Sequence, residues 1–84
     1  MKIVIAEQAW EDYLYWEARD AKLLERINSL VKKCRRTPFT GSDKPEPLRG
    51  DLRDWWSRRI TLEHLFVYRM ECESLLIAQC RYHY

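Results

Sequence analysis

The chain has little of what membrane-spanning, secreted or large proteins need. It contains no apolar run near the roughly 20 residues that cross a bilayer, and its first residues lack the apolar core and cleavage site of a signal peptide. Its 84 residues are too few for a multidomain enzyme, and its 46% hydrophobic and 33% charged content, with only two glycines and three prolines, excludes fibrous and disordered classes. We therefore expect one folded domain, residues 1–84, located in the cytoplasm and without a membrane partner.

Cysteines are also few, and their number is odd. The three of them, Cys34, Cys72 and Cys80, form no C-x-x-C motif, and only two histidines are present to complete a metal site. A zinc site needs about four ligands at short paired spacings. The sequence therefore favours buried or half-buried free thiols over a metal centre, and we expect neither a metal nor a cofactor.

The net charge of +2 conceals an uneven distribution. Residues 1–31 carry a net −2 and residues 60–84 a net −1, whereas residues 32–59 hold nine basic and four acidic side chains, a net +5. Lysine and arginine release counterions from phosphates, and the eleven aromatic residues of the chain could stack on bases. The basic segment thus indicates a phosphate-rich partner, with an ordinary solvated basic face as the alternative.

The first part of the chain predicts a strand followed by two helices. Residues 2–6 form a short β-branched run, and from Glu7 apolar residues recur with helical spacing. Asp20 is a candidate N-cap for the second helix, which should end before Pro38. In the first helix the helical spacing favours a place in the core for the tryptophan and tyrosine side chains, with a base-stacking platform as the alternative. Its predicted apolar stripe contains Trp10, Tyr13 and Leu14, with Ala9 and Trp16 beside them.

Every glycine and proline lies between positions 38 and 50, which predicts a loop there. About a dozen residues is longer than the usual connection of roughly 4 to 6, so this loop is a candidate for function. After it, a period of two through residues 55–62, 65–70 and 75–81 predicts three strands in an antiparallel meander. The expected fold is α+β, with an N-terminal strand and a two-helix hairpin packed on one face of a small, mainly antiparallel sheet.

Alternation along these strands separates two faces of the predicted sheet. Trp56 and Ile60 share one side, and Arg59 lies on the other. In the last strand one side carries Leu76, Ala78, Cys80 and Tyr82, and the other carries Leu75, Ile77, Gln79, Arg81 and His83. The helices should cover the more apolar face. The opposite face, with Arg59, Gln79, Arg81 and His83 beside the proline-rich loop, is expected to remain open as a basic surface.

Three residues could form a chemical group on that open face. Glu46 lies between two prolines, so its carboxylate is presented from a stiff loop, while Arg59 extends from a strand and His83 is the penultimate residue. A base, a cation and an acid are the parts that a metal-free ribonuclease needs. Ordinary solvated surface residues are the alternative interpretation, because a Glu, an Arg and a His occur in most chains.

Several stretches of the sequence carry a resemblance to a known family: residues 10–16, 36–39, 44–48, 56–60, 67–68 and 82–84. Through them the chain resembles, over its whole length, the YoeB branch of the RelE-type bacterial toxins. These are ribosome-dependent mRNA interferases with a RelE-like, microbial-ribonuclease-like fold. The resemblance implies a type II toxin that cuts mRNA in the ribosomal A site through a 2′,3′-cyclic phosphate, without a metal, and so inhibits translation.

The resemblance also implies roles and partners. Glu46 matches the general base, His83 the general acid, Arg59 a transition-state stabiliser and Tyr84 an aromatic that shapes the active site. Family members bind the 70S ribosome with its rRNA and mRNA, are held inactive by a YefM-like antitoxin, and are often homodimers. Arg49 matches a basic position near the substrate backbone. The full set of candidate RNA-binding residues is Lys32, Lys33, Arg35, Arg36, Lys44, Arg49 and Arg81. The cations at positions 32–36 also lie at the predicted C-terminal end of a helix, where positive charge is favourable to the helix dipole.

One position departs from the family pattern. Where the family typically has an arginine associated with the active site, this chain has Leu65. Losing such a donor could cost about 10² to 10³ in rate, so a catalytically weakened ribosome- or antitoxin-binding homologue is the alternative function. Arg69 and Arg81 are the candidate substitutes, of which Arg81 is favoured because Arg69 is roughly 13 Å along its strand. The resemblance assigns His64, in the preceding turn, no catalytic role.

Overall fold

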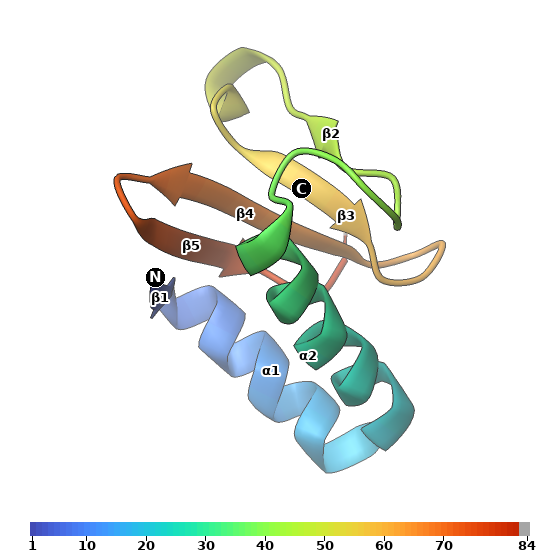
Figure 1. The fold of residues 1–84 in the computed structure, drawn as a ribbon. Coiled ribbons are helices and arrows are strands. Elements are labelled where there is room, and N and C mark those ends of the chain that lie inside the picture. The colour runs from blue at the N-terminus through green and yellow to red at the C-terminus, as the bar shows by residue number, and fades with distance from the viewer. Residues whose placement is uncertain (83–84) are drawn as a thin grey trace.

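A five-stranded sheet with both helices on one face forms the structure, a computed structural model that describes residues 1–82 (Figure 1). The strand order is β1-β5-β4-β3-β2, with β1 parallel to β5 and all other pairs antiparallel. The α+β class predicted from the sequence is confirmed. The elements are β1 (Lys2–Ile5), α1 (Glu7–Arg19), α2 (Ala21–Arg36), β2 (Glu46–Pro47), the 3₁₀ turn η1 (Gly50–Leu52), β3 (Trp56–Arg59), β4 (Leu65–Glu71) and β5 (Ser74–Gln79).

The second helix begins and ends where the sequence predicts. The Asp20 carboxylate accepts a hydrogen bond from the Leu23 amide at 3.1 Å, so Asp20 caps α2. The helix ends at Arg36, before Pro38. Within residues 1–82, neither helix combines the length and the apolar character needed to span a membrane.

The first helix turns a different face to the sheet than its apolar stripe predicts. Trp10 and Leu14 are 48% and 40% exposed, so their predicted place in the core is wrong. Two polar contacts decide the orientation instead. The Asp12 carboxylate accepts a hydrogen bond from the Cys80 amide at 3.0 Å, and the Trp16 indole donates one to the Cys80 carbonyl at 2.9 Å. Asp12 and Trp16 are one helical turn apart, so both bonds fix the rotation of α1 against the end of β5.

Two of the three cysteines behave as expected. Cys34 and Cys80 are free and buried, whereas Cys72 lies exposed in the β4–β5 turn, contrary to the expectation of a buried or half-buried thiol. Burial raises the pKa of the Cys34 thiol to about 11 and that of Cys80 to about 12. Both thiols therefore stay protonated at neutral pH and serve as small core residues.

Apolar side chains pack on both faces of the sheet. The larger cluster, between the sheet and the helices, includes Trp16, Ile27, Leu30, Ile60, Phe66, Tyr68, Leu75, Ile77 and Cys80. A smaller cluster on the other face contains Leu48, Leu65 and Val67, with Leu52 and Trp55 packed against it. The expectation that this face is an open basic surface is therefore wrong in part. Leu48 and Leu52, which precede β3, bring apolar side chains over the strands.

A bulge changes the faces of the last strand. Tyr68 pairs with Ile77, but its neighbour Val67 pairs with Gln79, so Ala78 is an extra residue in β5. Simple alternation places Ile77 and Cys80 on opposite sides, whereas both belong to the helix-facing core. The predicted face assignment holds for β3, where Trp56 and Ile60 pack toward the helices.

Candidate active site

The loop predicted between residues 38 and 50 contains a short strand that the sequence did not reveal. In β2, Glu46 pairs with Ser57 and Pro47 with Trp56 of β3. A proline is tolerated there because β2 is an edge strand of the sheet. The pairing gives Glu46 a defined position relative to β3, while its side chain remains exposed.

Glu46 and Arg59 share the face of the sheet that lies away from the helices. Directly paired residues point to the same side, so Glu46 shares a face with Ser57, and Arg59 follows two residues later on the same strand face. Such diagonal neighbours have Cα atoms about 7–8 Å apart. A carboxylate and a guanidinium at this separation can contact two sides of one phosphodiester group.

The end of the described chain reaches the same region. Arg59 pairs with Leu65, and the Leu65 amide donates a hydrogen bond to the Tyr82 carbonyl at 3.0 Å. The structure thus brings together two of the predicted site residues, Glu46 and Arg59, with the segment that leads to His83. His83 and Tyr84, the predicted acid and aromatic, lie outside the described residues.

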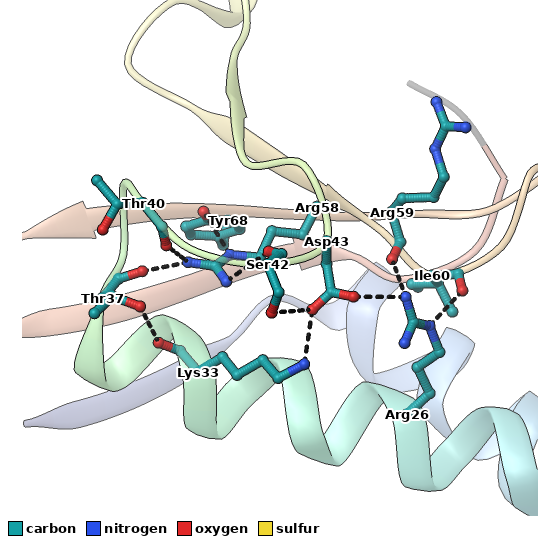
Figure 2. Close-up of polar contacts among 10 residues, drawn as sticks. All are labelled: Arg26, Lys33, Thr37, Thr40, Ser42, Asp43, Arg58, Arg59, Ile60 and Tyr68. Carbon is teal, nitrogen blue, oxygen red and sulfur yellow. Dashed lines mark hydrogen bonds and ion pairs between the residues drawn. The ribbon is translucent and has the colours of Figure 1, made fainter.

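Arg58, the neighbour of Arg59, holds the segment that precedes β2. Its side chain is fully buried and donates to the carbonyls of Thr37, Thr40 and Ser42 and to the Tyr68 hydroxyl (Figure 2). The bonds to Ser42, Thr40 and Tyr68 measure 3.2, 2.9 and 3.2 Å. A guanidinium can satisfy several acceptors because its donors point in fixed, divergent directions. Arg58 therefore ties the start of the loop to β3 and β4.

Tyr68 completes this buried network. Its hydroxyl donates to the Pro38 carbonyl at 2.5 Å while accepting from Arg58. Burial raises the pKa of the Tyr68 phenol to about 12, although the hydrogen bond from Arg58 works in the opposite direction. The hydroxyl is therefore a neutral donor at physiological pH, and it holds the loop directly after α2.

Asp43 connects the loop to the second helix. Its carboxylate forms ion pairs with Arg26 at 2.7 Å and Lys33 at 2.9 Å, and also accepts from the Ser42 hydroxyl (Figure 2). Its carbonyl accepts from the Arg59 amide at 2.9 Å, and Arg26 in turn donates to the Arg59 carbonyl at 3.1 Å. Both backbone groups of Arg59 are thus held by one ion-pair cluster.

Asp43 should make part of the stability of the protein dependent on pH. Burial favours a higher pKa for its carboxyl, but the hydrogen bonds from Lys33, Ser42 and Arg26 outweigh burial and lower the pKa below its usual value. The stabilisation by Asp43 is therefore fully present above the pKa of about 3.9 that its carboxyl has in the unfolded chain. It is lost as the pH falls through the lower pKa of the folded protein. We expect Asp43→Asn to be less stable than the parent protein at about pH 7, with the difference shrinking below about pH 4.

Urea unfolding at a series of pH values measures this difference. Asp51→Asn is the matched control, because Asp51 is exposed in η1. A destabilisation by Asp43→Asn that stays constant through the acidic range would contradict the assigned ion pairs.

The predicted RNA-binding residues do not form one continuous surface. Lys44 and Arg49 are exposed near β2, but Lys33 is engaged by Asp43. The remaining cations of the α2 end, Lys32, Arg35 and Arg36, line a surface hollow of about 330 Å³ together with Met1. They belong to the helix layer, whereas Glu46 and Arg59 lie on the other face of the sheet.

Arg81 is also placed differently from the expectation. Its guanidinium lies 3.4 Å from the ring centre of Tyr15, on α1, and 4.5 Å from that of Tyr82, whose hydroxyl accepts from it at 2.8 Å. The predicted location on the open face beside Arg59 is therefore wrong, because the aromatic ring of α1 draws this side chain to the helix side.

The position of Leu65 explains why its identity matters. It lies opposite Arg59 in the β3–β4 pairing and is only 8% exposed, within the smaller apolar cluster. Arg69, the other candidate substitute, pairs with Glu71 at 3.3 Å and lies over the Trp55 ring at 5.7 Å. The side of Arg59 that faces β4 is therefore lined by an aliphatic side chain.

Sequence reasoning missed the roles of Arg58 and Asp43. The sequence did carry a signal for Arg58. It lies two residues from both Trp56 and Ile60, so it shares their strand face, which is turned toward the helices. Asp43 offered no comparable signal, since its partners Arg26 and Lys33 lie 17 and 10 residues earlier, on α2, and no local pattern joins them to the loop. Within residues 1–82, no group of three or more His, Cys, Asp or Glu side chains is arranged to hold a metal ion.

Comparison with known proteins matches residues 5–84 to the model of the YoeB-like toxins of bacterial type II toxin-antitoxin systems. Toxin YoeB of Escherichia coli K12 is 55% identical over 84 residues, covering both chains completely. A YoeB/ParE toxin from Agrobacterium tumefaciens superposes with a TM-score of 0.97 at 50% identity, also over both full chains. The Staphylococcus aureus YoeB, solved in a YoeB-YefM complex and as a dimer, gives TM-scores of 0.91 and 0.92 at 39% and 40% identity, covering 100% of this chain and 98% of that one.

Proposed function

Because this chain belongs to the YoeB-like toxins of bacterial type II toxin-antitoxin systems, we propose that it is a metal-independent endoribonuclease that cuts mRNA in the ribosomal A site. The observation that carries the proposal is the shared face of Glu46 and Arg59, with Tyr82 hydrogen-bonded to the strand position opposite Arg59. This arrangement puts a carboxylate and a guanidinium on one face of neighbouring strands, with the chain that leads to His83 bonded to the next strand, β4.

Each residue has one step in the proposed reaction. The Glu46 carboxylate takes the proton from a ribose 2′-OH, whose oxygen attacks the adjacent phosphorus. Arg59 stabilises the extra negative charge on the phosphorane oxygens. His83 protonates the departing 5′-oxygen, so the products are a 2′,3′-cyclic phosphate and a 5′-hydroxyl end. Tyr84 contributes an aromatic side chain that shapes the site, and the ribosome positions the substrate, which explains how so small a domain suffices.

The candidate RNA contacts fall into two groups in this proposal. Lys44 and Arg49, near β2, bind the mRNA backbone close to the cut. Lys32, Arg35 and Arg36, on the helix layer, bind ribosomal RNA phosphates on the other side of the domain. Lys33 contributes less than its sequence position implies because Asp43 neutralises it.

Mapping the 5′ ends of mRNA in a translation reaction tests the proposal. The purified protein should generate new ends inside the A-site codon of ribosome-bound mRNA and leave free mRNA intact. Translation arrest without such ends would overturn the proposal.

A YefM-like antitoxin and a second copy of the chain are the proposed protein partners. The S. aureus relative was solved with YefM and as a dimer. Here β1 is an edge strand whose apolar side chains are exposed, and with Trp10 of α1 it borders an apolar hollow of about 390 Å³. An exposed apolar surface of this kind marks an interaction site. We assign this surface to the self-association of the chain.

Sedimentation measurements test the assignment of the dimer surface. Trp10→Ser should shift the protein toward the monomer, because it removes a large half-exposed aromatic from the surface. Phe39→Ser is the control, since Phe39 is exposed to a similar degree but follows α2 and contacts Trp56. Equal association of the parent and Trp10→Ser would contradict the assignment.

A catalytically weakened homologue is the second candidate function, and the placement of Leu65 favours it. An arginine at this position would extend from the strand position opposite Arg59, on the same face. The chain therefore has one guanidinium where two could share the transition-state charge. In this case the protein inhibits translation mainly by occupying the ribosome.

Leu65→Arg distinguishes the two functions. A weakened enzyme should gain about tenfold or more in cleavage rate, with little change in ribosome affinity, because the new donor acts on the transition state. Single-turnover cleavage on programmed ribosomes measures the rate. Leu76→Arg, on β5, is the control for adding a positive charge elsewhere on the sheet. An unchanged rate for Leu65→Arg would argue against the weakened-enzyme function.

A further inference from the structure

His64, to which neither the sequence nor the proposed reaction assigns a task, holds the C-terminal segment. Its Nδ1 accepts a hydrogen bond from the Tyr82 amide at 2.8 Å. An Nδ1 that accepts a hydrogen bond carries no proton, so the donor nitrogen of the ring is Nε2. The bond joins the β3–β4 turn to a residue 18 positions later in the chain.

The imidazole is held in place from several directions. Its ring packs edge-on against Trp16 with centroids 4.8 Å apart, and lies 5.5 Å from the Tyr82 ring. The His64 amide donates to the Thr61 hydroxyl at 3.2 Å, and its carbonyl accepts from the amides of Ile60 and Thr61 at 3.0 and 3.2 Å. The acceptor that receives the Tyr82 amide therefore has a defined position.

Tyr82 is held at both of its backbone groups by consecutive residues. His64 receives its amide and Leu65 donates to its carbonyl. Tyr82 also adopts a φ of 61°, in the left-handed region that non-glycine residues seldom occupy. A backbone in this region persists only where its surroundings hold it. The two hydrogen bonds supply that restraint, one residue before His83.

We propose that His64 is a positioning residue that fixes the backbone of the C-terminal segment at Tyr82, the residue that directly precedes the proposed general acid. It acts through the Tyr82 amide and does not touch the substrate. The consequence for cleavage rests on the proposed function, whereas the restraint on Tyr82 does not.

Two nearly isosteric replacements separate the hydrogen bond from packing. His64→Asn keeps an acceptor oxygen at the place of Nδ1, and His64→Leu fills the same space without an acceptor. Amide hydrogen exchange at Tyr82 should be about tenfold faster or more in His64→Leu than in the parent, and within about threefold of it in His64→Asn. Exchange at Leu75, in β5, should not change and shows that the sheet is intact.

Steady-state cleavage of ribosome-bound mRNA provides the second measurement. His64→Leu should lower kcat by about 10- to 100-fold with KM nearly unchanged, because a displaced acid affects proton transfer and not binding. His64→Asn should stay within about threefold of the parent. Equal kcat in His64→Leu and the parent, or equal losses in both variants, would overturn the proposal. If the parent protein does not cleave mRNA, the proposed function fails, and amide exchange remains as the test of the positioning role. Unchanged exchange at Tyr82 in His64→Leu would then overturn that role.

Discussion

Glu46→Gln should lower the rate of cleavage of ribosome-bound mRNA by about 10²- to 10⁴-fold, the range expected for loss of a general base. Glutamine keeps the size and hydrogen-bonding capacity of the side chain but cannot accept the 2′-OH proton. The exposed position of Glu46 on an edge strand leaves the fold unaffected by the change. Single-turnover cleavage with saturating protein isolates this step from binding.

The matched control is Glu73→Gln, the same change at an exposed position in the β4–β5 turn. It should leave the rate unchanged, while both variants bind the ribosome as the parent does. Cleavage by Glu46→Gln within about twofold of the parent would show that another group accepts the proton.

Arg58→Met should destabilise the protein by about 3 kcal/mol or more. The substitution fills the space but leaves the Thr37, Thr40 and Ser42 carbonyls, and the buried Tyr68 hydroxyl, without their common donor. An acceptor left unsatisfied and out of reach of water costs about 1–3 kcal/mol, and because these carbonyls are partly buried, solvent and loop relaxation recover part of this cost. Urea denaturation measures the free energy of unfolding.

Two further variants test the origin of that loss. Arg58→Lys retains the charge but cannot direct donors to all four acceptors, so we expect it to recover only part of the stability. Arg53→Met, at an exposed position, should be close to neutral. A loss of less than about 1 kcal/mol in Arg58→Met would contradict the role of Arg58 in holding the loop.

Local signals were sufficient to predict most of the fold. Asp20 and Pro38 mark the two ends of α2 because a capping carboxylate and a proline act on their immediate neighbours. The change of period from helical to alternating likewise predicts the order of α1, α2 and the three-strand meander. These features depend on residues close in sequence, and the structure confirms them.

Features that depend on distant partners were not predicted. Trp10 is exposed because the rotation of α1 is set by two hydrogen bonds with Cys80 at the end of β5, one accepted by Asp12 and one donated by Trp16. The bulge at Ala78 arises between two strands and leaves no mark in the period of either. The pairing of β2 with β3 is equally invisible in a stretch that is rich in proline and glycine.

The residues of the candidate site likewise fall into those that could be predicted from the sequence and those that could not. Glu46 and Arg59 could be named from residue chemistry and from the family resemblance, and the strand register now places both on one face. Arg81 could not be placed, because its location depends on the Tyr15 ring of another element. The supporting residues Arg58 and His64 were missed since each acts through contacts with segments far along the chain.

The chemical nature of the RNA ends tests the central claim most directly, namely that the face carrying Glu46 and Arg59 cuts RNA by attack of the 2′-OH. When ribosome-bound mRNA is treated with the parent protein, each upstream fragment should end in a 2′,3′-cyclic phosphate. Each downstream fragment should begin with a 5′-hydroxyl. The same fragments should be nearly absent with Glu46→Gln. Upstream 3′-hydroxyl ends with downstream 5′-phosphates, or equal yields from the parent and Glu46→Gln, would contradict the account.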